Sequence, residues 1–148
     1  MPQLSFHAPI GDISIAEEDG FIVSVDWGWS SFQESTPLLI EAQQQLEAYF
    51  DGLLKQFDLP INPYGTPYQK KVWQALQSIP YGKTCFYGDI SKKIGGSPRS
   101  VGNANAINPI PIIIPCHRVI ARNSLGGYSG EGGSETKKFL LNLEAHNY

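Results

Sequence analysis

The most reactive side chains of the sequence stand together where Cys116 is followed directly by His117 and Arg118, after the apolar residues 110–114. A thiolate is a strong nucleophile, but a free cysteine is only slightly ionised at neutral pH. A histidine can take the thiol proton, and a neighbouring cation favours the anion that remains. A buried, unreactive cysteine gives the same pattern and is the commoner case. Cys116 is therefore a candidate nucleophile whose assignment depends on the rest of the chain.

The charges of the chain are divided unequally between its two parts, although the net charge is only −3. Residues 1–60 carry ten acidic side chains against one basic side chain, whereas residues 61–148 carry ten basic and four acidic side chains. Such a division indicates a polyanion-binding region beside an acidic one. An ordinary solvated surface with uneven charge gives the same count, so this feature alone leaves both interpretations open.

Length and composition restrict the class of protein. A chain of 148 residues fits one domain, or a small domain joined to a moderate one. No apolar run approaches the roughly 18 residues that span a bilayer, and the N-terminus lacks the basic and apolar regions of a secretory signal. Two cysteines, Cys85 and Cys116, are too few for a disulfide scaffold, and their spacing predicts no zinc site. We expect a cytoplasmic protein that has no membrane segment and binds no metal.

The elements of residues 1–60 predict a small domain. Residues 4–7, 11–16 and 20–27 alternate apolar and polar side chains, as half-buried strands do. Pro37 begins a helix that ends near Gly52. We therefore expect an antiparallel sheet with one packed helix, and nothing in this part suggests a catalytic group.

Residues 58–65, with two prolines, are typical of a linker, and a mostly helical domain over 65–148 follows. Thr66 and Pro67 are suited to begin its first helix. Two short helices, over 87–94 and 99–106, flank a Gly-Gly-Ser-Pro turn, which is the spacing of a helix-turn-helix.

The second of these short helices consists almost entirely of small and polar residues. Gly102 lowers the stability of the helix, so we expect a reason in packing or in close approach. Further on, a glycine-rich segment over 124–133 suits a pocket wall better than a phosphate loop. A last helix over 134–145 is expected to bury Phe139, Leu140 and Leu143.

Four motifs in this order resemble those of the O6-alkylguanine-DNA alkyltransferases. They are the helix-turn-helix, Asn108-Pro109, Pro-Cys-His-Arg-Val at 115–119 and Tyr-Ser-Gly at 128–130. The match covers about residues 65–144, and residues 1–60 resemble the sheet-and-helix domain that precedes it in that family. The resemblance implies an α+β fold and a DNA repair methyltransferase that moves an alkyl group irreversibly from O6 of guanine to its own cysteine. It implies no cofactor. The expected partner is double-stranded DNA containing O6-alkylguanine, and the protein is expected to act as a monomer.

The resemblance also implies a role for each matching residue. Cys116 resembles the alkyl acceptor, His117 the base that reaches it through a water, and Glu144 the carboxylate that orients this histidine. Asn108 resembles the residue that braces the turn, Tyr87 the one that rotates the nucleotide, and Arg99 the one that fills the space left in the base stack. Ser100 and Asn103 resemble residues that contact DNA. Val119, Tyr128 and Ser129 resemble residues that border the guanine. Arg118 looks structural. Glu131 departs from the glycine that many relatives have, so the size of alkyl group that is accepted stays open.

The chemistry of the lesion is consistent with this assignment. An alkyl group on O6 is buried in the duplex, so the nucleotide must leave the base stack, at a cost of a few kcal/mol. A side chain that fills the gap and basic contacts to phosphate can offset that cost. The thiolate then displaces guanine in line at the alkyl carbon, and the thioether that forms is stable in water.

Two other functions fit part of the same evidence. A module that binds alkylated guanine without repairing it would need the helix-turn-helix alone, but related binding-only proteins replace the cysteine that is kept here as Cys116. A cysteine hydrolase could use Cys116 with His117, although adjacent residues seldom align for direct proton transfer.

Overall fold

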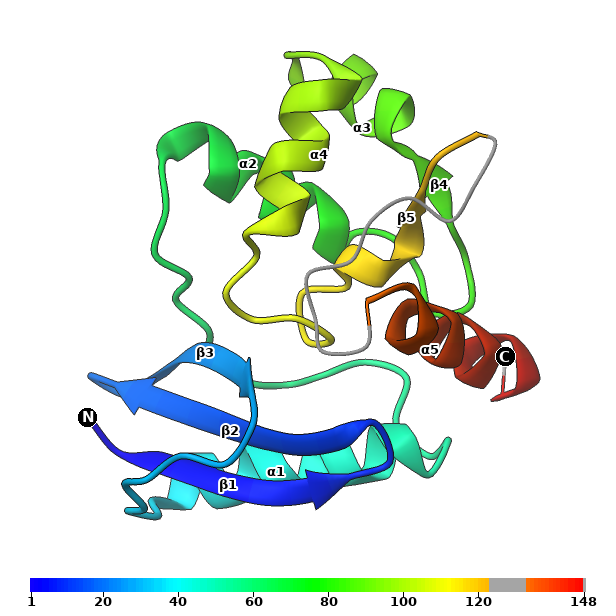
Figure 1. Cartoon of the computed structure of the whole chain (residues 1–148). Coiled ribbons are helices and arrows are strands. Elements are labelled where there is room, and N and C mark those ends of the chain that lie inside the picture. The colour runs from blue at the N-terminus through cyan, green and yellow to red at the C-terminus, as the bar shows by residue number, and fades with distance from the viewer. Residues whose placement is uncertain (123–132, 148) are drawn as a thin grey trace. The chain divides into compact units, whose positions relative to one another are not determined.

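A computed structural model of the chain describes residues 1–122 and 133–147 (Figure 1). The chain forms two compact units, Met1–Pro63 and Tyr64–Tyr148. The predicted α+β fold, with a small antiparallel sheet and helix first and a mostly helical part second, is confirmed.

The first unit is a three-stranded antiparallel meander with a helix on one face (Figure 1). Its elements are β1 (Gln3–Ala8), β2 (Gly11–Glu18), β3 (Phe21–Trp27) and α1 (Pro37–Phe50). Apolar residues of the strands, such as Ile13, Ile15 and Val25, pack against Leu39 and Leu46 of α1 to form its core. This unit holds the sheet and helix that the alternating pattern predicts.

The second unit contains the residues predicted to do chemistry. Its elements are α2 (Pro67–Gln77), β4 (Cys85–Phe86), α3 (Tyr87–Ile94), α4 (Pro98–Ala106), the 3₁₀ helix η1 (Cys116–Arg118), β5 (Val119–Ile120) and α5 (Ser134–Asn147). Thr66 caps α2, because its hydroxyl accepts a hydrogen bond from the backbone of Gln69. The buried indole of Trp73 donates to the carbonyl oxygen of Ala104 over 2.9 Å and so ties α2 to α4.

Helices α3 and α4 occupy the positions predicted for the helix-turn-helix, with α4 beginning one residue earlier than expected. The turn between them needs glycine at two positions, because Gly95 and Gly96 have φ angles of 96° and 82°. A Cβ atom at Gly96 would also collide with the hydroxyl of Tyr68. That hydroxyl donates to the carbonyl oxygen of Gly95 and lies 2.9 Å from Oγ of Ser100, so it fixes both sides of the turn.

A short parallel pairing, which the sequence did not indicate, positions the two halves of the candidate site. Cys85 pairs with Val119, and Phe86 pairs with Ile120. Because α3 begins directly after β4, Tyr87 is brought beside the strand that follows Cys116. Within residues 1–122 and 133–147, no helix is long and apolar enough to cross a membrane.

Candidate functional site

Cys116 opens the 3₁₀ helix η1 at the end of a buried, isoleucine-rich stretch. Ile110 and Ile114 are fully buried, and Ile112 has a φ angle of 74°, a strained conformation for a β-branched residue. The amide of Cys116 donates to the carbonyl oxygen of Ile114 over 2.7 Å. The side chain is 1% exposed, so the thiol is held in the interior on a constrained turn.

Asn108 braces this turn through both atoms of its amide. Its Nδ2 donates to the carbonyl oxygen of Ile114 over 2.9 Å, and its Oδ1 accepts the backbone N–H of Ile110 over 3.0 Å. The side chain is 6% exposed, so these bonds form in a region of low dielectric, where they are strong. These bonds hold the turn that carries Cys116, and the role of Asn108 in the reaction stays a prediction.

The imidazole of His117 is anchored through Nε2. Its Nε2 lies 2.6 Å from Oε2 of Glu144, and both side chains are buried. Glu144 also accepts two hydrogen bonds from Arg118, at 2.9 and 3.0 Å, and one from the backbone N–H of Gly82. A carboxylate paired with a guanidinium in this way is ionised and only accepts. The network therefore assigns the proton to Nε2 and leaves a lone pair on Nδ1.

Arg118 acts on the site through Glu144. Besides the carboxylate, its guanidinium donates to the carbonyl oxygen of Ile79 over 2.8 Å. Arg118 therefore contacts the carboxylate of Glu144 and the backbone of Ile79. This geometry agrees with the structural role expected from the sequence.

Burial controls the ionisation of both candidate reacting groups. It raises the pKa of the Cys116 thiol from 9.0 to about 11, against the opposing effects of the Asn108 hydrogen bond and the Lys137 charge. Burial also lowers the pKa of His117, which the hydrogen bond and charge of Glu144 only partly oppose. At neutral pH the thiol is protonated and the imidazole is neutral, which is the starting state that a thiol and its base require.

The sequence did not identify Lys137, which is fully buried on α5. Its ammonium donates to the carbonyl oxygen of Val119 over 2.6 Å and lies 6.0 Å from the ring centre of Tyr87. Burial lowers the pKa of Lys137 to about 8, and the negative charge of a Cys116 thiolate would raise it. The spacing along the sequence did indicate this position. Leu140 and Glu144 follow Lys137 by three and seven residues, which places all three on one face of a helix.

These contacts define one buried cluster, whose members are Cys116, His117, Arg118, Lys137 and Glu144. The expected burial of Phe139 on the same helix is wrong, since its side chain is 39% exposed; Leu140 is buried as predicted and Leu143 only half-buried. The face of α5 that packs inward carries Thr136, Lys137, Leu140 and Glu144 instead. The apolar pattern predicted an apolar buried face for α5. Lys137 and Glu144 are buried on this face instead, because hydrogen bonds and ion pairs within the cluster compensate for their burial.

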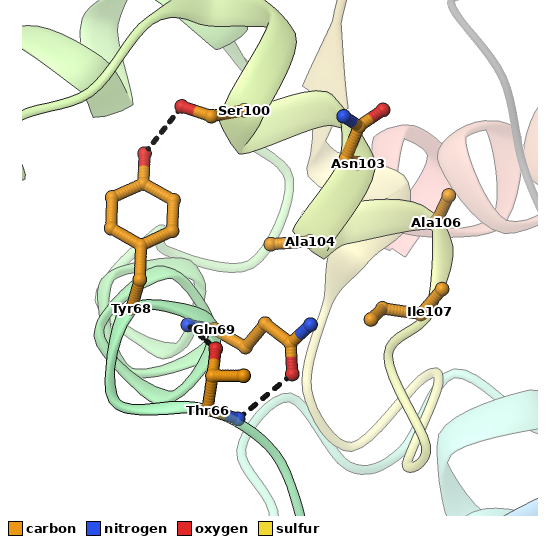
Figure 2. A pocket seen from close by; sticks show the side chains of 8 residues that line it. All are labelled: Thr66, Tyr68, Gln69, Ser100, Asn103, Ala104, Ala106 and Ile107. Atoms are coloured by element: carbon orange, nitrogen blue, oxygen red, sulfur yellow. Dashed lines mark hydrogen bonds between the residues drawn. The ribbon is translucent and has the colours of Figure 1, made fainter.

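The predicted DNA-contacting residues lie on a second surface, the α4 face, formed by Arg99, Ser100 and Asn103. Arg99 and Asn103 are exposed and Ser100 is half-buried. Ser100 and Asn103 border a shallow cavity of about 480 Å³ between α4 and the start of α2 (Figure 2). The residues that line it are uncharged: Thr66, Tyr68, Gln69, Ser100, Asn103, Ala104, Ala106 and Ile107.

The structure thus brings some predicted site residues together and leaves others apart. Cys116, His117, Glu144 and Asn108 lie in one connected set of contacts, and Lys137 joins Val119 and Tyr87 to it. Tyr87, at the first position of α3, is half-buried. Tyr128, Ser129 and Glu131 lie outside the described residues. Within the described part of the chain, no three His, Cys, Asp or Glu side chains are grouped to hold a metal.

The arrangement supplies a thiol, a neutral imidazole oriented by a carboxylate, and a buried ammonium near the sulfur. These are the parts needed to form a thiolate at neutral pH and to direct it at an electrophile. Because the cluster is closed to water, the charge on sulfur would be stabilised by fixed groups of the protein.

Comparisons with known proteins cover nearly the whole chain. The family model described as 6-O-methylguanine DNA methyltransferase, DNA binding domain, matches residues 67–146, and the model described as the ribonuclease-like domain of the same protein matches residues 5–63. The constitutive methylated-DNA--protein-cysteine methyltransferase of Bacillus subtilis is 46% identical, over 95% of this chain and 93% of that protein. A methylated-DNA--protein-cysteine methyltransferase of Methanosarcina acetivorans is also 46% identical, over 94% and 95%.

Solved structures give the same result for the fold. The crystal structure of Mycobacterium tuberculosis OGT in complex with DNA has a TM-score of 0.89 and 38% identity, covering 99% of this chain and 94% of that chain. The structure described as O6-methylguanine methyltransferase from the same organism has a TM-score of 0.88 and 36% identity, with the same coverage.

Proposed function

The chain belongs to the 6-O-methylguanine DNA methyltransferase family and is a DNA repair protein that transfers an alkyl group to a cysteine, and we propose that Cys116 is that cysteine. The observation that carries this assignment is the tethered imidazole of His117. Its Nε2 is held 2.6 Å from Glu144, while the buried Nδ1 has no hydrogen-bond partner among the described residues. A buried, unpaired nitrogen on the residue next to the thiol supports a role for His117 in taking its proton.

The first step is removal of the thiol proton. His117 Nδ1 accepts the proton of Cys116 through one water, and Glu144 stabilises the imidazolium that forms. Arg118 keeps Glu144 ionised and in place. Lys137 and Asn108 stabilise the negative charge on sulfur, because both oppose the effect of burial on the thiol. Proton transfer to a group so positioned contributes about 10²- to 10⁴-fold in rate.

The second step is an in-line displacement at the alkyl carbon. A bond forms between the sulfur of Cys116 and this carbon as the carbon–O6 bond breaks, and the bonding electron pair passes to guanine. Guanine regains a proton, which balances the one released by the thiol. Holding sulfur and carbon in alignment supplies a large share of the rate. The thioether is not hydrolysed, so each protein molecule reacts once.

The α4 face and Tyr87 are proposed to deliver the lesion. Tyr87 would crowd the phosphate and rotate the nucleotide out of the stack, and Arg99 would fill the space it leaves. Ser100 and Asn103 would contact the DNA beside them, and the small side chains of α4 (Pro98–Ala106) support a close approach. Val119, Tyr128 and Ser129 would border the extruded guanine.

We test the assignment with duplex DNA that carries a single O6-methylguanine. The wild-type protein should gain one methyl group on the peptide containing Cys116, measured by mass spectrometry, and should stop after one equivalent. Cys116→Ala should bind the duplex without removing the methyl group, whereas the matched variant Cys85→Ala should react like wild type. An unmodified Cys116 after complete binding would refute the assignment, and repeated turnover of an ester substrate would favour a hydrolase instead.

Three further expectations belong to this proposal. The functional domains would be residues 1–60 and a DNA-binding and alkyl-transfer domain over 65–148. The protein would act as a monomer on double-stranded DNA containing O6-alkylguanine, and sedimentation with and without duplex would check this. It would work in the cytoplasm, which agrees with both cysteines being free thiols.

A further inference from the structure

One short stretch between α2 and β4, residues 79–82, holds both members of the Arg118–Glu144 ion pair. The carbonyl oxygen of Ile79 accepts a hydrogen bond from the guanidinium of Arg118 over 2.8 Å. The backbone N–H of Gly82 donates to Oε1 of Glu144 over 3.2 Å. The position of the carboxylate therefore depends on this stretch of backbone as well as on the side chains of the buried cluster.

Each carboxylate oxygen of Glu144 has two neighbours. Oε2 accepts from Arg118 over 3.0 Å and lies 2.6 Å from Nε2 of His117. Oε1 accepts from Arg118 over 2.9 Å and from the N–H of Gly82. The side chain is 1% exposed, so bulk water does not replace a donor that is lost. The N–H of Gly82 thus fixes the oxygen that does not contact His117.

The type of turn decides where the N–H of Gly82 points. The N–H of Lys83 donates to the carbonyl oxygen of Pro80 over 3.1 Å, which closes a β-turn with Tyr81 and Gly82 at its centre. Gly82 has a φ angle of 77°, as the third residue of a type II turn requires. A type I turn is closed by the same hydrogen bond, but its central peptide is rotated by about half a turn. The carbonyl oxygen of Tyr81 would then face Glu144 in place of the N–H.

Building on the proposed function, we infer that Gly82 is a positioning residue for alkyl transfer, which acts through Glu144 on His117. A type II turn needs a residue that tolerates a positive φ angle, and glycine does so without strain. A residue with a Cβ atom favours the type I turn, in which an acceptor that repels the carboxylate replaces the donor. Glu144 would then shift and His117 would lose its orientation, although the chain would follow nearly the same path.

The inference is tested by comparing Gly82→Ala with Gly82→Asn. The single-turnover rate of Gly82→Ala should fall by about 10-fold or more, the range of one hydrogen bond to a charged group. The loss should be equal on duplex DNA with O6-methylguanine and on free O6-benzylguanine. Asparagine adopts a positive φ angle more readily than alanine, so Gly82→Asn should react faster than Gly82→Ala although its side chain is larger. A steric effect alone would give the opposite order.

The matched control is Gly20→Ala, in the turn between β2 and β3. Gly20 has a φ angle of 83°, and a Cβ atom there would meet nothing within 4 Å among the described residues. The substitution imposes a similar backbone strain far from the chemistry in sequence. It should lower the Tm but leave the reaction with both substrates unchanged.

NMR of protein labelled with ¹⁵N-histidine separates positioning from a general loss of stability. The chain has only three histidines, so the signals are readily assigned. The Nε2 proton of His117, bonded over 2.6 Å to a carboxylate, should resonate far downfield of ordinary imidazole protons. This signal should weaken or move upfield in Gly82→Ala and should be kept in Gly82→Asn and Gly20→Ala.

The inference is overturned if folded Gly82→Ala reacts at the wild-type rate, reacts faster than Gly82→Asn, or slows without a change in the His117 signal. Should Gly82→Ala fail to fold, hydrogen exchange of wild type decides. The amide proton of Gly82 should exchange slowly because its acceptor is buried, and rapid exchange would overturn the inference. Failure of wild type itself to modify Cys116 would refute the proposed function, a result distinct from the loss of a difference between the variants.

Discussion

The buried cluster and the α4 face use polar residues in opposite ways. In the buried cluster, Glu144 alone accepts from His117, Arg118 and the backbone of Gly82, and every member is less than one-tenth exposed. On the α4 face, Arg99 and Asn103 are exposed to solvent. One region is a network in which each group depends on the others, whereas on the α4 face Ser100 is bonded to Tyr68 but Arg99 and Asn103 lie in solvent.

This difference indicates which measurement each region should control. Loss of one partner in a buried network leaves a charge or acceptor unpaired, so stability and chemistry should fall together. An exposed residue contributes little to folding, and its effect should be confined to duplex DNA and depend on salt. Two results would contradict this comparison. One is a variant of the buried cluster that changes neither stability nor the rate of alkyl transfer. The other is a variant of the α4 face that slows the reaction with the free base.

The largest effect is expected for Glu144→Gln. The change removes the negative charge that compensates Arg118 and orients His117, in a site that is 1% exposed. We expect a loss of about 3–5 kcal/mol in the free energy of unfolding in urea, as for other broken buried pairs. The rate of alkyl transfer should fall by about 10²- to 10⁴-fold, equally on duplex DNA and on free O6-benzylguanine.

The matched control is Asn103→Ala on the α4 face. Its side chain is exposed, so the free energy of unfolding should change by no more than about 0.5 kcal/mol. If Glu144→Gln were as stable as this control, the cluster would not be the dependent network described above.

The next effect is a pH dependence of stability carried by the thiol. Because burial raises the pKa of Cys116 from 9.0 to about 11, the unfolded chain loses this proton first as the pH rises. The contribution of the thiol to stability is complete below pH 9 and is lost as the pH rises through 11. Unfolding free energies of wild type and Cys116→Ala, measured from pH 8 to 11, should therefore diverge by about 2 kcal/mol, with wild type losing more. Parallel curves would mean that the sulfur is accessible to water.

The comparison also explains which parts could be predicted from sequence. Cys116, His117 and Asn108 lie close together in the chain, where local spacing and the family resemblance suffice to name them. Lys137 was missed and Phe139 was wrongly buried, because the apolar pattern of α5 assumes that charged side chains face water. Buried pairing overrode that rule, and pairing depends on contacts between residues far apart in sequence.

The fold was predictable to a similar degree. Caps, glycines and alternating patterns located every main helix and the three strands, since these signals are local. The parallel pairing of Cys85 with Val119 carries no such signal, because each strand has only two residues and its partner lies more than thirty positions away. That pairing nevertheless places Tyr87 near Lys137, so it matters for the site.

A smaller effect, confined to DNA, is expected for Arg99→Ala. If Arg99 fills the gap left by the extruded nucleotide, its loss removes part of the compensation for unstacking. The single-turnover rate on duplex DNA should fall by about 10- to 100-fold, a share of the few kcal/mol that extrusion costs. Reaction with free O6-benzylguanine, which needs no extrusion, should be unchanged. Equal losses on both substrates would place Arg99 in the chemistry and remove the distinction between the two regions.

The smallest effect is expected for Gly102→Ala, which should raise the stability of the fold but lower the rate of repair on duplex DNA. A Cβ atom at this position would meet only the ring of Tyr87 among the described residues, at 3.9 Å, which is ordinary contact. Alanine should therefore stabilise α4 by up to about 1 kcal/mol, seen as a rise in Tm. Since nothing in the described chain requires glycine here, the remaining reason for it is the close approach of DNA. Duplex repair should then slow while the free-base reaction stays constant; a variant that is more stable and repairs duplex DNA at the wild-type rate would show that DNA does not approach α4 at Gly102.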